Sequence, residues 1–280
     1  MKRESKEKNP DNSRVTTGIG IGIGICLVLL FSHIPLVLRS AAAFLCVGSV
    51  WEVHRAVRQD DIHWVTYCSL AAAAIASVLP ISGYDTLLLV LFPVAVLMFC
   101  YLMRMVGKIT QIHTGVLECI TVVLIVFYCG IPQVRRMDKG FYLLTAATLV
   151  GCVTDIGAYA FGRAFGRHKL APKVSPHKTV EGSIGGLLCT VAVLLPAAFL
   201  CEKSGLVTVR YGVFLSYLLL TSLIGQFGDL AMSSIKRIVG IKDYGHLLPG
   251  HGGILDRFDS LLFTVPFTYL FCRYIGVIFL

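Results

Sequence analysis

Long apolar stretches, broken by short polar segments, occupy nearly the whole chain. A helix that crosses a bilayer needs about 20 mostly apolar residues, and irregular backbone cannot cross while it is exposed to lipid. The pattern therefore predicts an all-α, polytopic integral membrane protein, a bundle of about nine transmembrane helices. The expected helices cover roughly residues 15–38, 40–54, 63–81, 84–103, 113–132, 141–162, 182–201, 211–235 and 256–280. The second stretch is short and the last two carry charges near their ends, so a bundle of eight is the alternative.

The composition supports a membrane protein. Of the 280 residues, 56% are hydrophobic and 15% are charged, whereas a soluble domain averages about 25% charged residues. These values exclude a soluble enzyme and a disordered chain. With nine helices and a cytosolic N-terminus, 18 of the 25 Lys and Arg residues lie on the cytosolic side, in agreement with the positive-inside rule. The expected location is the bacterial inner (plasma) membrane.

The chain is expected to divide into a charged cytosolic tail (1–14), N-terminal transmembrane helices (15–135) and a C-terminal catalytic transmembrane region (136–280). A basic start and a run of alanines at 41–43 would also suit a cleaved signal peptide, but the long tail and the polytopic remainder favour an uncleaved helix. The glycine run 18–24 lacks the spacing of a nucleotide-binding loop and predicts close helix packing. The ten cysteines form no C-x-x-C pair, which indicates free thiols rather than a zinc site.

Four aspartates interrupt the apolar stretches of the second half. Asp155 lies in the sixth stretch, Asp229 near the end of the eighth, and Asp256 and Asp259 at the start of the ninth. A charge at membrane depth is costly, so it is normally paired, hydrated and functional. Asp256 and Asp259 share a helix face by their spacing, and a cytosolic loop brings Asp229 beside them. Three carboxylates at the mouth of a helical bundle predict a cation site of the kind that suits Mg²⁺.

Two basic segments flank these aspartates. Residues 163–182 and 236–253 combine Lys and Arg with Gly and Pro, a composition that suits backbone folded around phosphates. Glycines at 250, 252 and 253 lead directly into Asp256 and allow backbone N–H groups to approach a ligand closely. The positive-inside rule alone would also place basic loops here, which is the alternative. Together with the aspartates, the two segments predict a polar, cytosol-facing active-site cavity.

Two long motifs cover these positions. The first is Asp155-x-Gly157-Ala158-Tyr159, followed by Lys169-Leu170-Ala171-Pro172-x-Val174-Ser175-Pro176-x-Lys178-Thr179-x-Glu181-Gly182. The second is Ser233-x-Ile235-Lys236-Arg237-x4-Lys242-Asp243, followed by Leu248-Pro249-Gly250-His251-Gly252-Gly253-Ile254-Leu255-Asp256-Arg257-Phe258-Asp259-Ser260. Both resemble the phosphatidate cytidylyltransferases, the CDP-diacylglycerol synthases. The resemblance covers roughly residues 140–262, while the first half is similar only in being hydrophobic.

The resemblance implies an enzyme of phospholipid biosynthesis that transfers the cytidylyl group of CTP to phosphatidate, giving CDP-diacylglycerol and pyrophosphate. Its partners would be CTP, phosphatidate and membrane lipid, with no nucleic acid. Mg²⁺ would be the cofactor. The resemblance leaves open whether a second, monovalent cation binds and whether the protein forms a homodimer. A CTP-dependent lipid kinase of the dolichol-kinase type and a membrane transporter are the alternatives, although no inverted repeat of the 226–260 pattern occurs in the first half.

The resemblance also implies roles for individual residues. The expected metal ligands are Asp229, Asp256 and Asp259. The expected catalytic residues are these three with Lys236, Arg237, Lys242, Asp243 and Arg257, whose cations would hold the triphosphate or the lipid phosphate. The expected substrate-binding residues are Asp155, Ser175, Lys178, Thr179, Glu181, Ser233, His251, Gly252 and Gly253.

Overall fold

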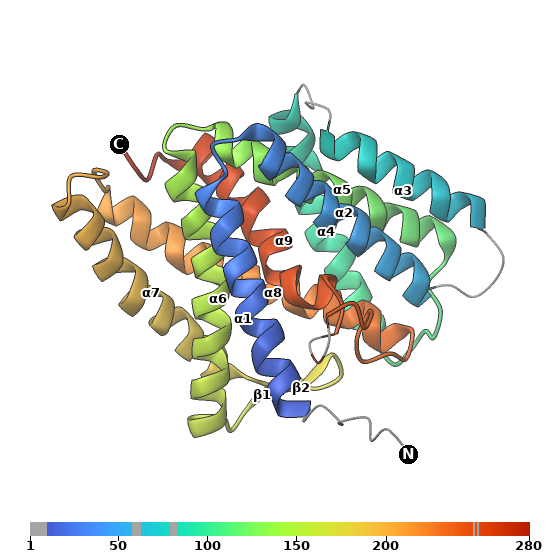
Figure 1. Ribbon diagram of the computed structural model, residues 1–280. Coiled ribbons are helices and arrows are strands. Elements are labelled where there is room, and N and C mark those ends of the chain that lie inside the picture. Colours follow the sequence, from blue (N-terminus) through green and yellow to red (C-terminus); the bar gives the residue numbers. More distant parts are fainter. Residues whose placement is uncertain (1–9, 58–62, 79–82, 249, 251) are drawn as a thin grey trace, which may run out of the picture.

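The computed structural model describes residues 10–57, 63–78, 83–248, 250 and 252–280. Within these residues the chain forms nine α-helices and one β-hairpin (Figure 1). The helices are α1 (Pro10–Leu30), α2 (Pro35–Val57), α3 (His63–Val78), α4 (Tyr84–Met105), α5 (Thr114–Arg136), α6 (Gly140–Phe165), α7 (Val180–Lys203), α8 (Tyr211–Ile238) and α9 (Leu255–Leu270). The strands are β1 (Lys169–Ala171) and β2 (Ser175–Thr179), and a π-helical turn, η1 (Phe271–Ile275), follows α9. The prediction of about nine helices is confirmed for the described residues.

Six of the described helices, α2 and α4 to α8, are long and apolar enough to cross a membrane. Shorter apolar segments lie in α1 (Thr16–Leu30) and α3 (Thr66–Ala76). Large apolar side chains such as Leu36, Leu97 and Ile156 are exposed on the outside of the bundle, where lipid replaces water as the solvent. The ten cysteines are all free thiols. The chain is a multi-pass membrane protein, and crossings beyond these six helices stay a prediction.

The first two helices differ from the expected ranges. The apolar pattern predicts one helix over 15–38, but α1 ends at Leu30 and α2 begins at Pro35. A proline disfavours helical backbone at the residue before it, here Ile34, and is itself favoured in the first turn of a new helix. Hydropathy alone does not register this break, because the flanking residues are apolar on both sides.

The last helix is shorter than the predicted 256–280. After η1, Gly276 ends the helical segment and the chain turns back along the residues that precede α8. The N–H of Arg210 donates to the Ile278 carbonyl at 3.0 Å, and Thr208 and Leu280 exchange backbone hydrogen bonds of 3.3 and 2.9 Å. The C-terminal residues therefore satisfy their backbone by pairing with another segment instead of by continuing α9.

The all-α prediction is wrong at one place, the hairpin between α6 and α7. Its strands are antiparallel, with Lys169 opposite Thr179 and Ala171 opposite Ser175. The N–H of Val174 donates to the Ala171 carbonyl at 3.1 Å and closes the turn. The hairpin lies at one end of the bundle, where it carries the part of the first motif from Lys169 to Thr179 (Figure 1).

Helix α9 lies at the centre of the bundle and contacts α2, α4, α5, α6 and α8. On it, Phe263 packs against Phe127, Phe99 and Phe227 with ring centroids 5.2–5.7 Å apart. Helices α6 and α7 pack closely because a side chain at Gly186 would lie 2.8 Å from the Thr154 carbonyl oxygen. Because α9 contacts α2, α4 and α5 as well as α6 and α8, it is held between helices from both halves of the chain.

Three glycines of α1 do not pack closely against another helix. A side-chain carbon added at Gly20, Gly22 or Gly24 would have no atom within 4 Å. The predicted close packing is therefore wrong for these three positions within the single chain. Helix α1 instead packs on α2 and α6, and its partly buried Val28 and Leu29 reach the core.

Candidate active site

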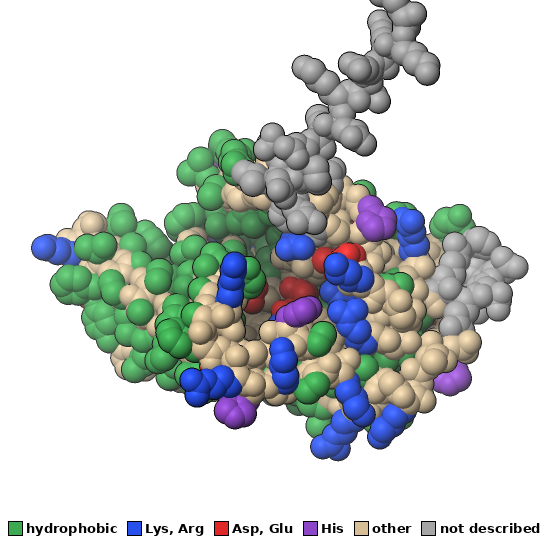
Figure 2. All heavy atoms as spheres, turned by 90° about the horizontal axis from the view of Figure 1, so that it is seen from below, with side chains coloured by type: hydrophobic (Ala, Val, Ile, Leu, Met, Phe, Trp, Pro, Cys, Tyr) green, Lys and Arg blue, Asp and Glu red, His purple; other side chains and the backbone are tan. Residues whose placement is uncertain are grey.

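A cavity of about 650 Å³ lies at the end of the bundle that carries the hairpin. Its walls come from α6, the hairpin, the start of α7, the C-terminal half of α8, the α8–α9 loop and the first turn of α9. Figure 2 looks at this end and shows acidic side chains inside a hollow with Lys and Arg side chains around it. The predicted site residues that line the cavity are Asp155, Lys178, Thr179, Asp229, Lys236, Asp243, Asp256, Arg257 and Asp259.

Three carboxylates from three helices face this cavity together. Asp155 of α6, Asp229 of α8 and Asp259 of α9 are near enough for their charges to act on one another. Ser260 connects two of them, because its N–H donates to Asp259 Oδ1 at 2.7 Å and its hydroxyl donates to Asp155 Oδ2 at 3.2 Å. The Ser233 hydroxyl donates to Asp229 Oδ1 at 3.3 Å. Such a group of like charges favours a cation or a cationic side chain among them.

Lys178 provides one such cation. From β2, its Nζ lies 2.5 Å from Asp229 Oδ2, and each of the two side chains is 26% exposed. An ion pair that is this exposed to water contributes little to stability and can exchange its partners. The Lys178–Asp229 pair is therefore suited to rearrangement when an anion enters the cavity.

Lys236 and Asp256 form the second ion pair, which is buried. Lys236 Nζ lies 2.7 Å from Asp256 Oδ1, and the side chains are only 10% and 3% exposed. The other oxygen, Oδ2, accepts hydrogen bonds from the Tyr244 N–H at 2.8 Å and the Gly253 N–H at 2.9 Å. Gly252, beside it, has a φ of 84°, which a residue with a side chain rarely adopts. Asp256 thus organises the loop that precedes it as well as facing the cavity.

Tyr244 closes this loop onto α8. Its hydroxyl donates to the Met232 carbonyl at 2.8 Å, and its ring lies 5.4 Å from Lys236 Nζ, in cation–π contact. Burial raises the pKa of the Tyr244 hydroxyl well above its usual value, and the nearby carboxylate of Asp256 adds to the shift. The phenol therefore stays protonated and acts as a fixed donor.

Several predicted site residues hold the surrounding backbone instead. Arg237 donates from Nε to the Val174 carbonyl at 3.1 Å and from Nη1 to the Ile241 carbonyl at 3.0 Å, so it joins the hairpin turn to the end of α8. Glu181 accepts hydrogen bonds from the N–H groups of Arg167 and His168 at 3.0 and 3.1 Å, which fixes the start of the hairpin.

The remaining predicted residues are distributed around the cavity. Thr179 caps α7, because its hydroxyl accepts from the Gly182 N–H at 3.1 Å. Ser175 lies in β2 but does not line the cavity, and Lys242 is exposed on the α8–α9 loop. Gly252 pairs with Leu248 across that loop. His251 lies outside the described residues.

The sequence prediction missed Glu52, a fully buried carboxylate of α2. Its oxygens accept hydrogen bonds from the N–H groups of Ile254 at 2.8 Å and Leu255 at 2.9 Å. These N–H groups belong to the start of α9, so Glu52 caps this helix from a distant part of the chain. A side-chain carbon at Gly245 would lie 2.8 Å from Glu52 Oε1, so the loop fits closely around the carboxylate. The available signal was a lone acid within an apolar stretch.

We expect Glu52→Gln to lower activity without any contact between residue 52 and the substrates. The amide keeps the volume but can accept only one of the two N–H groups well, and an unpaired buried N–H costs about 1–3 kcal/mol. The loss of the negative charge at a helix N-terminus adds to this cost. Thermal unfolding in detergent should show the destabilisation. For CTP, the nucleotide that the sequence resemblance implies, kcat/KM measured well below the unfolding temperature should fall at least about tenfold, about 1.4 kcal/mol.

Glu118→Gln is the matched control for this positioning role. Glu118, on α5, accepts from the Ser69 hydroxyl of α3 at 3.0 Å and lies 3.8 Å from His54 Nε2 of α2, and neither partner belongs to the α8–α9 loop. It should leave kcat/KM unchanged. Equal kcat/KM values for the native protein and Glu52→Gln would contradict the assigned role of Glu52.

Comparison with known proteins shows the family of the chain. The model of the cytidylyltransferase family matches residues 12–275. Proteins named phosphatidate cytidylyltransferase are similar over 129 residues: 48% identical in Staphylococcus aureus strain COL, 46% in Staphylococcus haemolyticus and 44% in Staphylococcus epidermidis. Each match covers 46% of this chain and 48% of the relative, so the chain spans about half the length of the relatives it matches.

The family match extends over nearly the whole chain. It includes α1 and α2, which lie outside the two motifs. It also includes the cavity, with every residue that lines it. The chain belongs to the cytidylyltransferase family.

Proposed function

We propose that the protein transfers the cytidylyl group of CTP to phosphatidate. An oxygen of the phosphatidate phosphate attacks the α-phosphorus of CTP, and the bond between the α- and β-phosphates breaks. A new phosphoanhydride bond forms in CDP-diacylglycerol, and pyrophosphate leaves with the electron pair of the broken bond. The phosphatidate phosphate is largely ionised at neutral pH, because the second pKa of such monoesters is about 6, and so no strong base is needed.

One observation carries the proposal. A single cavity at the end of an apolar bundle brings together the carboxylates of Asp155, Asp229 and Asp259 and the cations of Lys178, Lys236 and Arg257. Phosphoryl and nucleotidyl transfer depend chiefly on positioning two anions and stabilising the charge that spreads between them. The mixture of charges supports this chemistry, and the position at the end of the bundle supports one polar and one lipid substrate.

The two ion pairs suggest different tasks for the two lysines. Lys178 can leave Asp229 for a phosphate oxygen, because that pair is partly exposed. Lys236 is held by the buried Asp256 and offers a fixed positive charge at the cavity wall. Arg257, exposed beside them on α9, has the planar fork that suits a phosphate. On substrate binding, the Lys178 ammonium would thus leave Asp229 and contact a phosphate.

The donor set fits Mg²⁺ when the nucleotide is present. Within the described part of the chain, no three His, Cys, Asp or Glu side chains are grouped closely enough to hold a metal ion by themselves. Mg²⁺ usually takes only one or two carboxylates and completes its shell with water and substrate phosphates. Asp229 and Asp259, with Asp155 beside them, would hold the ion, which neutralises charge on the phosphates. Asp256 would bind the ion only after one of its carboxylate oxygens has lost its present hydrogen-bond donors.

We place the cavity on the cytosolic side of the bacterial inner (plasma) membrane, where CTP is available. The predicted charge asymmetry supports this orientation, and the basic side chains seen around the hollow in Figure 2 agree with the positive-inside rule.

The decisive experiment follows two labels of CTP. Purified protein in detergent is incubated with phosphatidate, Mg²⁺ and CTP that carries ³²P at either the α- or the γ-phosphate. We expect the α-label in the lipid extract and the γ-label in pyrophosphate. Label from the γ-phosphate in the lipid would instead identify a lipid kinase, and a lipid extract that carries neither label would overturn the proposal.

A further inference from the structure

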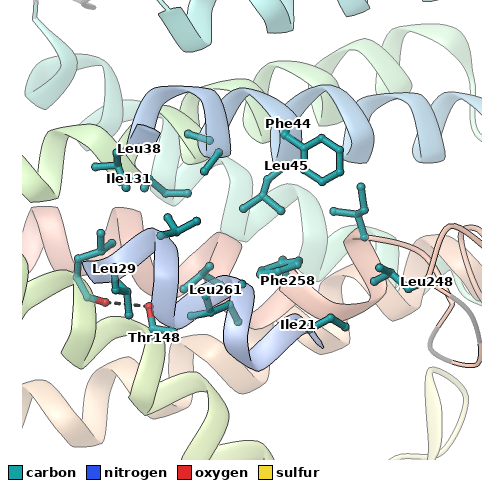
Figure 3. A pocket seen from close by; sticks show the side chains of 17 residues that line it. Ile21, Leu29, Leu38, Phe44, Leu45, Ile131, Thr148, Leu248, Phe258 and Leu261 are labelled. Carbon is teal, nitrogen blue, oxygen red and sulfur yellow. Dashed lines mark hydrogen bonds between the residues drawn. The ribbon is translucent and has the colours of Figure 1, made fainter. Parts of the chain in front are cut away.

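A second, apolar pocket of about 260 Å³ lies between α1 and the rest of the bundle. Figure 3 shows Ile21 and Leu29 of α1 on one side, with Phe44 and Leu45 of α2 and Phe258 of α9 directed toward the same space. Its lining also includes residues of α5 and α6 and Leu248 of the α8–α9 loop.

The walls of this pocket offer nothing to a polar ligand. Its lining side chains are aliphatic or aromatic, apart from Gly24 and Thr148. The Thr148 hydroxyl already donates to the Leu144 carbonyl at 2.9 Å (Figure 3). A water molecule needs two to four polar partners to occupy a cavity, and none is offered here. The fitting occupant is therefore a hydrocarbon chain.

No described residue lines both the apolar pocket and the polar cavity, but the two are lined by neighbouring residues of α6 and α9. On α9, Arg257 and Asp259 line the cavity, whereas the intervening Phe258 lines the pocket. On α6, Thr148 of the pocket and Asp155 of the cavity are seven residues apart, which places them on one helix face about 10 Å apart along the axis. A lipid whose phosphate reaches the cavity has its chains within reach of the pocket.

We propose that this pocket holds one acyl chain of the lipid substrate while the phosphate of the same molecule occupies the cavity. The inference rests on the proposed function, since it assigns a chain of phosphatidate to a subsite beside the reaction centre. It predicts that the walls of the pocket, and α1 in particular, set which acyl chains are accepted, because the space available there limits the bulk of the chain.

Gly24 allows a direct test. It lines the pocket, and a Cβ added there meets no atom within 4 Å, so Gly24→Phe can add a ring at the pocket wall. Gly22 lies on the same helix, is equally open and does not line the pocket, so Gly22→Phe is the matched control. The measurement is kcat/KM for dipalmitoyl and for dihexanoyl phosphatidate in the same mixed micelles, together with KM for CTP.

We expect Gly24→Phe to lower the long-to-short ratio of kcat/KM at least about fivefold, a modest part of the discrimination that apolar pockets reach. The dihexanoyl rate and KM for CTP should stay as in the native protein, and Gly22→Phe should keep the native ratio. An unchanged ratio in Gly24→Phe, or an equal change in Gly22→Phe, overturns the acyl subsite. If the native protein converts neither lipid, the proposed function itself fails.

A binding measurement separates these outcomes and does not depend on the folding of a variant. Phosphatidate with a diazirine in one long acyl chain is photolysed with the native protein. We expect the label on peptides of α1 and α2 that line the pocket, with competition by unlabelled phosphatidate. Labelling confined to the outer surface of α4, far from the pocket lining, overturns the inference.

Discussion

Asp229→Asn should reduce cytidylyl transfer at least about 100-fold while the protein stays folded. The substitution removes a negative charge from the cavity but hardly changes the volume of the side chain. The Lys178–Asp229 pair is partly exposed, and such pairs contribute at most about 1 kcal/mol to stability. The expected loss of rate corresponds to about 2.7 kcal/mol of transition-state stabilisation, similar to the cost of removing one electrostatic contact from a preorganised active site.

The comparison variant is Asp85→Asn. Asp85 lies in the first turn of α4, and its ion-pair partner is Arg273 at 3.8 Å, outside the cavity lining. Both variants should unfold thermally within a few degrees of the native protein, and only Asp229→Asn should lose activity. Near-native turnover of Asp229→Asn at ordinary Mg²⁺ would remove this carboxylate from the proposed site.

Asp256→Asn should differ in kind, because it should lose both stability and activity. The substitution leaves the buried ammonium of Lys236 without its counter-charge, and breaking a buried pair from one side costs about 3–5 kcal/mol. It also disturbs the acceptor for the Tyr244 and Gly253 N–H groups. Thermal unfolding and turnover, measured on the same preparation, should both fall, in contrast to Asp229→Asn.

A double variant separates the two losses. In Lys236→Met with Asp256→Asn, no uncompensated charge is buried, so a large part of the stability should return. Activity should not return, because the fixed cation at the cavity wall is missing. A stable double variant with native turnover would assign this ion pair to the fold alone.

Much of the fold was predictable because lipid imposes a strong pattern on the sequence. Apolar runs located the nine helices, whereas their ends depended on local chemistry that hydropathy does not record. Pro35 divides what looks like one long helix, and Gly276 ends α9 before the C-terminal residues pair with Arg210 and its neighbours. The hairpin was missed because its strands are only three and five residues long and contain Pro176 and two lysines, residue types that are depleted in strands.

The candidate site was predictable to a similar degree. Acids in apolar stretches are costly, so Asp155, Asp229 and Asp259 could be singled out from the sequence, and they face one cavity. The division of labour was not predictable, because it depends on which way each side chain turns. Adjacent residues on α8 illustrate this, since Lys236 lines the cavity and Arg237 binds the hairpin turn. Glu52 could not be connected to α9 without the fold.

The bond between Glu52 and α9 has a consequence for biosynthesis. Glu52 and Ile254 are separated by 202 positions along the chain. At synthesis rates of about 5–20 residues per second, the carboxylate enters the assembling bundle about 10–40 s before its partner N–H groups exist. During that interval the acid must keep water, a proton or a temporary partner, because an unpaired charge among apolar helices is costly. The docking of α9 ends this interval, so the candidate site is completed in one late step. A nascent chain that stops before α9 keeps the Glu52 carboxylate without these two N–H donors.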